Sequence, residues 1–200
     1  MRGAGELLIS GGYSLSGEVE VSDGRLAFNT PAASISLSDL VVIAPGRLDG
    51  GDNFQISNTL TWQGGEIRSP DSSSQLTLQS GAVATMTLTD PRPFATLSAR
   101  RLVNQGTWRV NSNASVNTVW YLDAGVVIDN QSVLEFNNAG TQEFRLSCTL
   151  ADCASFLNAA TGSVRFDSNP GLLAIDASLG SFDNAGSVQL IQGCAAIDAP

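Results

Sequence analysis

The sequence predicts an all-β fold: a single-stranded parallel β-helix, or β-solenoid, of about seven or eight coils. Three observations predict it. One asparagine recurs at the same phase of a unit of about 26 residues, short segments alternate apolar and polar residues, and no long stretch carries a helical stripe. A unit this short cannot bury its own apolar face. It is expected to stack on copies of itself, with parallel strands pairing between coils.

The repeat is clearest in the second half of the chain, over residues 99–192. Its asparagines are separated by 26, 28 and 26 residues. A large apolar residue stands two positions before each one, and an apolar-polar-apolar triad follows. The third copy holds two extra residues in "NAATGSV", which explains the longer spacing. The asparagines are Asn104, Asn130, Asn158 and Asn184; the apolar residues before them are Leu102, Ile128, Phe156 and Phe182.

A fainter copy lies upstream in "ISNTLTW", where Ile56 precedes Asn58 by two positions and Trp62 follows it by four. Asn58 lies 46 residues before Asn104, or two slightly shorter units. We therefore expect Asn58 to occupy the same corner as the later asparagines. The intervening copy, "LTLQSGAVATMTL", has the alternation without the asparagine.

The asparagines are predicted to be structural. Stacked at a corner, each amide can donate a hydrogen bond to the carbonyl of the next asparagine and form a ladder along the axis. Asparagine also tolerates the left-handed conformation that corners often require, and Gly106, Gly162 and Gly186 are expected to supply the same freedom. The functional alternative is a row of amides that contacts a ligand.

The alternation fixes which side chains face inward. Within the triads, the outward positions hold Arg109, Glu135, Arg165 and Gln189. The alternative fold is an antiparallel sandwich, but a sandwich does not predict one asparagine at the same phase of successive units. We expect residues 1–200 to form one solenoid domain. Because the first residues read like the middle of a repetitive protein, we expect a fragment of a longer chain.

Two of the three cysteines flank a short polar segment, "TLAD". Cys148 and Cys153 are predicted to form a disulfide, and the alternative is a pair of buried or reduced thiols. The spacing is poor for zinc, because no histidine or second cysteine pair accompanies it. Cys194 is left over, which fits either a partner beyond the end of this sequence or a buried thiol. A disulfide would imply export from the cytoplasm.

Composition excludes several functions. A net charge of -9 with scattered arginines argues against nucleic-acid binding, and no apolar run is long enough to span a bilayer. The chain has no histidine and no lysine, which removes triads with histidine, imidazole metal sites and Schiff-base lysines. We predict no enzyme and no cofactor. The segment "RLDGGDN", residues 47–53, has the composition of a calcium loop but not its ligand spacing, so common aspartate-glycine turns explain it better.

The units "RRLVNQGTWRV", "FLNAATGSVRF" and "FDNAGSVQL", with the upstream "NTLTWQGGEI", resemble the degenerate repeats of large bacterial secreted and surface proteins. These are the autotransporter passenger and filamentous-haemagglutinin-like adhesins, which are right-handed parallel β-helices of the pectin-lyase-like shape. The resemblance covers roughly residues 54–192. It implies an extracellular or cell-surface protein of a Gram-negative-type bacterium in which the β-helix is a stalk or adhesive rod.

The enzymes of that fold family carry motifs that this chain lacks. Polygalacturonases have an Asp-Asp doublet and a Gly-His-Gly, and the stretch "DPRPFATLSAR" offers Arg92-Pro93 in the wrong spacing for a pectate lyase. We therefore predict a non-catalytic structural or adhesive segment. The alternatives are a polysaccharide-active enzyme and a carbohydrate-binding β-helix. Expected partners are a host or environmental surface glycan or protein, and uncapped ends would associate end to end.

Overall fold

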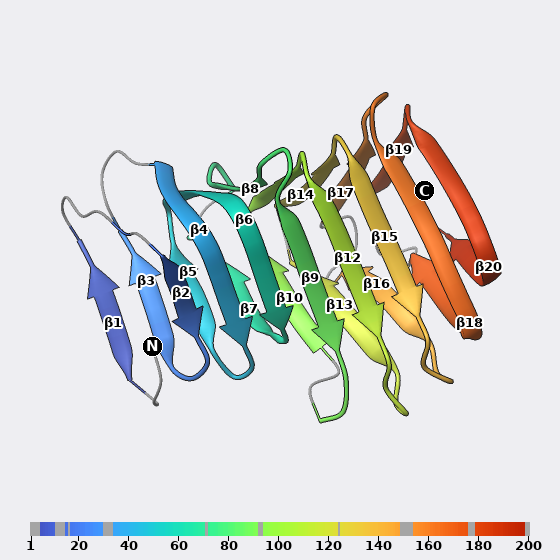
Figure 1. The fold of residues 1–200 in the computed structure, drawn as a ribbon, viewed down its shortest axis with the longest axis horizontal. Coiled ribbons are helices and arrows are strands. Elements are labelled where there is room, and N and C mark those ends of the chain that lie inside the picture. The colour runs from blue at the N-terminus through green and yellow to red at the C-terminus, as the bar shows by residue number, and fades with distance from the viewer. Residues whose placement is uncertain are drawn as a thin grey trace.

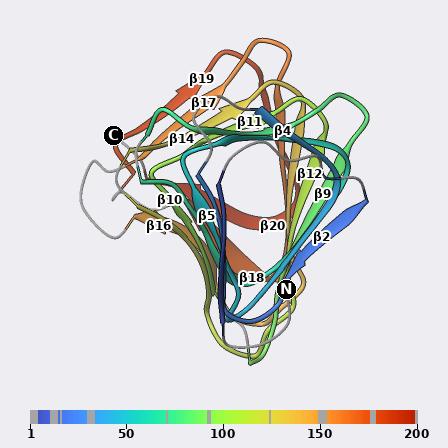
Figure 2. The same cartoon turned by 90° about the vertical axis from the view of Figure 1, so that its left-hand side faces the viewer.

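The computed structural model describes residues 5–10, 15, 17–29, 34–70, 72–91, 94–123, 125–148, 154–175 and 179–198. These residues form a β-solenoid of about seven turns, elongated along one axis, with the first and last strands at opposite ends (Figure 1). Viewed end-on, the coil has a three-sided outline (Figure 2). The described part of the chain contains strands and turns and no helix, as the sequence predicts.

Each turn of the coil contributes one strand to each of three faces. The first face holds β1 (Glu6–Ile9), β3 (Arg25–Phe28), β5 (Arg47–Gly50), β7 (Gly65–Arg68), β10 (Phe94–Ser98), β13 (Thr118–Leu122) and β16 (Phe144–Cys148). The second holds β8 (Gln75–Leu78), β11 (Arg101–Asn104), β14 (Val126–Asn130), β17 (Ala154–Asn158) and β19 (Ser181–Asn184). The third holds β2 (Glu18–Val21), β9 (Val83–Leu88), β12 (Thr107–Ser112) and β15 (Val133–Asn138).

Four longer strands bend from one face to the next. β4 (Ser34–Ile43) and β6 (Asn53–Gln63) run from the second face onto the third, and β18 (Ser163–Ile175) and β20 (Ser187–Ile197) run from the third onto the first. Every strand pairing found among the described residues is parallel and joins a strand to its equivalent in the next turn. This pairing excludes the antiparallel sandwich.

The register confirms the repeat in the second half of the chain. Leu102 pairs with Ile128, Ile128 with Phe156, and Phe156 with Phe182. The triads align in the same way, so Trp108 stands beside Leu134 and Arg109 beside Glu135. Stacking of equivalent side chains follows directly from this register: the rings of Phe156 and Phe182 are 4.9 Å apart.

The inward side chains of the three faces fill one continuous core. Its largest members are three tryptophans, all fully buried: Trp62 and Trp108 from the third face and Trp120 from the first. Trp120 stacks on Trp108 and meets Trp62 edge to face, with ring centroids 6.0 Å apart in both pairs. The core is therefore tied together across faces as well as along the axis.

At the C-terminal end of the described rod, the apolar columns reach the surface. Val188 and Leu190 in β20 lie in register with the buried Val164 and Phe166 of β18, but both are exposed. Leu190 is 55% exposed, and β20 is the last strand of its face in the described part of the chain. This apolar end is the surface through which the predicted end-to-end association would occur.

Candidate functional site

The predicted asparagine ladder forms a continuous hydrogen-bonded column at the corner between the second and third faces. Each side-chain Nδ2 donates to the Oδ1 of the next asparagine toward the C-terminus. The distances are 2.7 Å from Asn104 to Asn130, 2.8 Å from Asn130 to Asn158, and 2.7 Å from Asn158 to Asn184. The first three asparagines are fully buried, and only Asn184 is exposed.

The same amides also bind the backbone of the next turn. In each step, the side-chain nitrogen donates to the carbonyl of a residue at the start of the next third-face strand. These acceptors are Val133 at 2.8 Å, Ser163 at 3.2 Å and Ser187 at 3.1 Å. The amides therefore tie each corner to the backbone of the next turn, which is a structural role.

The ladder has a direction and a defined beginning. Asn104 pairs in register with Leu78 of the preceding turn, which has no polar group to offer. The Oδ1 atom of Asn104 is buried and has no hydrogen-bond partner among the described residues. All the donors point toward the C-terminus, so this acceptor is the unfilled end of the column.

Asn58 does not belong to the ladder, and its predicted alignment is wrong. The register places Ile56, not Asn58, in line with Leu78 and Asn104. Asn58 is exposed and donates to Asp39 Oδ1 at 2.8 Å. Hydrogen bonds from Ser38, Thr59 and Asn58 lower the pKa of Asp39 below its ordinary value. The sequence alignment failed because a shift of two residues leaves the inward-outward alternation unchanged.

The corner glycines have a different role from the predicted one. Among the described residues, the left-handed region is occupied by other glycines and by Ala99, and Gly106, Gly162 and Gly186 are not in it. A Cβ at Gly106 would lie 2.3 Å from the carbonyl oxygen of Ala82 in the preceding turn. These glycines therefore allow close approach between turns, and conformational freedom is not their function.

The cysteines follow the prediction as far as the structure describes them. Cys148, at the end of β16, is disulfide-bonded. Its predicted partner, Cys153, lies outside the described residues. Cys194 in β20 is an exposed free thiol.

An ion-pair row crosses the first face at the segment that has the composition of a calcium loop. Asp49 is buried and its Oδ2 accepts a hydrogen bond from Arg25 Nε at 2.7 Å, with Arg47 Nε at 3.1 Å. Burial would raise the pKa of Asp49, but the hydrogen bond from Arg25 and the positive charges of Arg25, Arg47 and Arg68 outweigh it and lower the pKa. Over the described residues, no group of three or more Asp, Glu, His or Cys side chains is placed to hold a metal ion.

A buried arginine, which the sequence analysis did not identify, holds the corner between the first and second faces. Arg100 is fully buried, and its guanidinium lies 4.9 Å from the ring centroid of Phe54. Its terminal nitrogens donate to four backbone carbonyls of the two preceding turns. These belong to Gly50 at 2.6 Å, Asp52 at 2.8 Å, Gln75 at 3.0 Å and Arg68 at 3.1 Å. Arg100 precedes the inward-facing Leu102 and Asn104 by two and four positions. The inward-outward alternation of a strand therefore places its side chain on the inner side as well.

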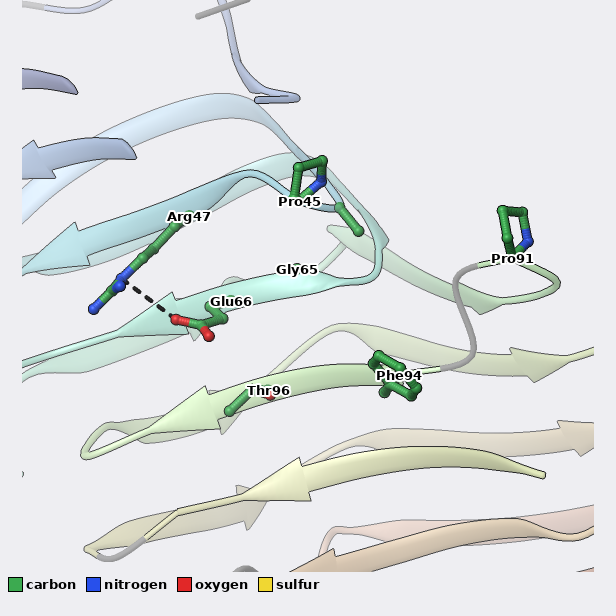
Figure 3. A pocket seen from close by; sticks show the side chains of 8 residues that line it. Pro45, Arg47, Gly65, Glu66, Pro91, Phe94 and Thr96 are labelled. Carbon is green, nitrogen blue, oxygen red and sulfur yellow. Dashed lines mark ion pairs between the residues drawn. The ribbon is translucent and has the colours of Figure 1, made fainter. Parts of the chain in front are cut away.

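A lateral hollow on the first face is the candidate binding site (Figure 3). Its volume is about 340 Å³. It lies between the turn at Pro45, the backbone of Gly65 and the exposed ring of Phe94. The polar rim comes from neighbouring turns of the coil. The lining residues are Ala44, Pro45, Arg47, Gly65, Glu66, Pro91, Phe94 and Thr96.

The rim of the hollow carries opposite charges. Arg47 Nε and Glu66 Oε2 are 3.3 Å apart and form the ion pair drawn in Figure 3. Neither of these two atoms has a hydrogen bond of good geometry within the described residues. Thr96 lies in register with Glu66 on the next strand, and Tyr121 follows Thr96 one turn further on. The Tyr121 ring is tilted against Phe94 at a centroid distance of 6.4 Å.

Comparison with known proteins gives no match to a family model, a curated protein or a solved structure. The fold is therefore established by the strand register alone. Within the described ranges, no helix combines the length and the apolar character needed to cross a bilayer.

Proposed function

We propose that this chain is a non-catalytic, rod-forming β-solenoid segment of an exported bacterial surface protein. The observation that carries the proposal is the asparagine ladder. It runs without a break from Asn104 to Asn184, alongside a core that is continuous from turn to turn. Such a column joins neighbouring turns by side-chain as well as backbone hydrogen bonds, which suits a stiff spacer.

The disulfide supports export. Cys148 is disulfide-bonded, and disulfides persist in oxidising compartments outside the cytoplasm. The outward positions of the third face pair charges along the rod: Arg109 meets Glu135 at 3.0 Å, and Arg165 meets the same carboxylate at 3.1 Å. These exposed pairs contribute little stability each but keep a long parallel sheet hydrophilic on its outer side.

The lining of the hollow supports a role without catalysis. Of its lining residues, only Glu66 is acidic, and that carboxylate faces Arg47. Hydrolysis of a glycosidic bond ordinarily uses two carboxyl groups on opposite sides of the bond. A single acidic residue in the lining therefore argues against glycoside hydrolysis at this hollow.

The proposal is tested on intact cells that produce the protein. Antibody labelling before permeabilisation, and loss of the label after external protease treatment, are expected if the rod is displayed outside the cell. Label that appears only after permeabilisation would contradict export. Release of reducing or unsaturated ends from a panel of neutral and acidic polysaccharides by the purified protein would contradict the non-catalytic role.

A further inference from the structure

We infer that the lateral hollow binds one uncharged pyranose unit of a glycan. The inference rests on the proposed function, because a rod displayed outside a cell presents this hollow to surface glycans. Its volume of about 340 Å³ lies at the small end of the range for ligand sites. It therefore suits a single ring, and an extended peptide would need a longer groove.

The wall of the hollow provides a flat apolar surface. Phe94 is 55% exposed at the start of β10, whereas most of the other phenylalanines that the structure describes are fully buried in the core. Pro45, Gly65 and Pro91 also line the hollow (Figure 3). The C–H face of a pyranose ring packs against such a ring and gains apolar contact without losing its equatorial hydroxyl groups to burial.

The rim supplies hydrogen-bonding groups at the edge of that surface. The side chains of Arg47 and Glu66 are 34% and 42% exposed, so beyond the buried Nε and Oε2 atoms that face each other at 3.3 Å the guanidinium has further N–H donors and the carboxylate a second acceptor oxygen. Thr96 adds a hydroxyl that can donate or accept. Neighbouring hydroxyl groups on a sugar ring, each both donor and acceptor, can bind such a pair at once.

The charge of the rim selects an uncharged ligand. Arg47 is the one cation among the described lining residues, and it is already matched by Asp49 at 3.1 Å and Glu66 at 3.3 Å. The chain as a whole carries a net charge of -9. A uronic acid or sialic acid would therefore meet repulsion both from Glu66 and from the molecule.

The test measures binding to the purified protein by isothermal titration calorimetry and saturation-transfer NMR. The probes are the neutral oligosaccharides cellotetraose, mannotetraose and lacto-N-tetraose, the anionic tetragalacturonate, and a proline-rich peptide. The variants are Phe94→Ala, Phe94→Trp and Glu66→Gln. Leu190→Ala is the matched control, since Leu190 is also 55% exposed but lies at the end of the rod.

We expect at least one neutral probe to bind, with about tenfold weaker affinity for Phe94→Ala and near-normal affinity for Phe94→Trp and Leu190→Ala. Glu66→Gln should weaken neutral binding less than Phe94→Ala does, and it should reduce the discrimination against the anionic probe because it removes the charge that repels it. Neutral binding that survives Phe94→Ala, binding of only the anionic probe or only the peptide, or no binding at all would overturn the inference. Surface labelling of intact cells would still report separately on the proposed rod.

Discussion

Replacing Asn130 with alanine tests the ladder at its centre. The side chain makes four hydrogen bonds: its Nδ2 donates to Asn158 Oδ1, Ser132 O and Ser163 O, and its Oδ1 accepts from Asn104. Alanine removes them all. Asn158 Oδ1 loses the donor from the ladder, and Asn104 Nδ2 keeps only its bond to Val133.

The expected loss follows from counting the polar atoms left without partners. The substitution leaves Asn158 Oδ1 and one N–H of Asn104 unpaired in buried positions. Each unpaired buried group costs about 1–3 kcal/mol, so we expect the two groups to cost about 2–6 kcal/mol together. For a chain of this size, the melting temperature should fall by about 4–24 °C.

The assay is equilibrium unfolding in urea, followed by the fluorescence of the three buried tryptophans. Asn58→Ala is the matched control. Asn58 is exposed and lies outside the ladder, so its unfolding free energy should change by about 1 kcal/mol or less. Equal losses for Asn58→Ala and Asn130→Ala, or no loss for Asn130→Ala, would refute the reasoning.

Three further predictions use other parts of the structure. Leu78→Asn should be less destabilising than Ile56→Asn by about 1–3 kcal/mol, because only the new asparagine at position 78 can donate to the unpaired Asn104 Oδ1. Both positions are fully buried and belong to one column, so urea unfolding of the two variants measures the difference. Arg100→Met should cost on the order of 4 kcal/mol and Arg100→Lys should not rescue it, because one ammonium cannot reach four carbonyls; a normal melting temperature for either would contradict this. Because the folded pKa of Asp49 is lowered, its contribution is present above the ordinary value of 3.8 and is lost as pH falls through the folded pKa. Asp49→Asn should therefore flatten the acid limb of the unfolding free energy below about pH 4, and identical limbs would contradict this.

The sequence predicted the parts of the fold that repeat at a constant phase. Asn104, Asn130, Asn158 and Asn184 are equivalent in successive turns, so their spacing revealed both the coil length and the ladder. Stacking makes this possible, because each turn imposes the same environment on the same position. The parallel pairing and the inward residues follow from the same regularity.

The sequence-based predictions are wrong where only the apolar-polar alternation was available to align one turn with the next. Asn58 was placed two residues from its true column because alternation has a period of two and tolerates that shift. Gly106 was interpreted through its backbone freedom, whereas the structure shows that its lack of a side chain is what the neighbouring turn requires. That contact joins residues of different turns, which local sequence rules do not describe.

The hollow could not be predicted because it forms where the turns are irregular. Arg47 pairs with Glu66 and Glu66 with Thr96, although the two intervening stretches differ in length by many residues. Phe94 and Gly65 line one hollow only because the coil places their strands, β10 and β7, side by side. Arg100 was missed for a different reason: an arginine is rarely fully buried, and its inward parity was outweighed by its charge.

Hydrogen exchange of the side-chain amides tests the stacked ladder most directly. In a spectrum with assigned asparagine side chains, the amide protons of Asn104, Asn130 and Asn158 should be strongly protected, because each is buried and bonded to the next turn. Those of the exposed Asn58 should exchange rapidly. Rapid exchange of all four side chains would contradict the ladder, and with it the alignment of successive turns on which the rod is built.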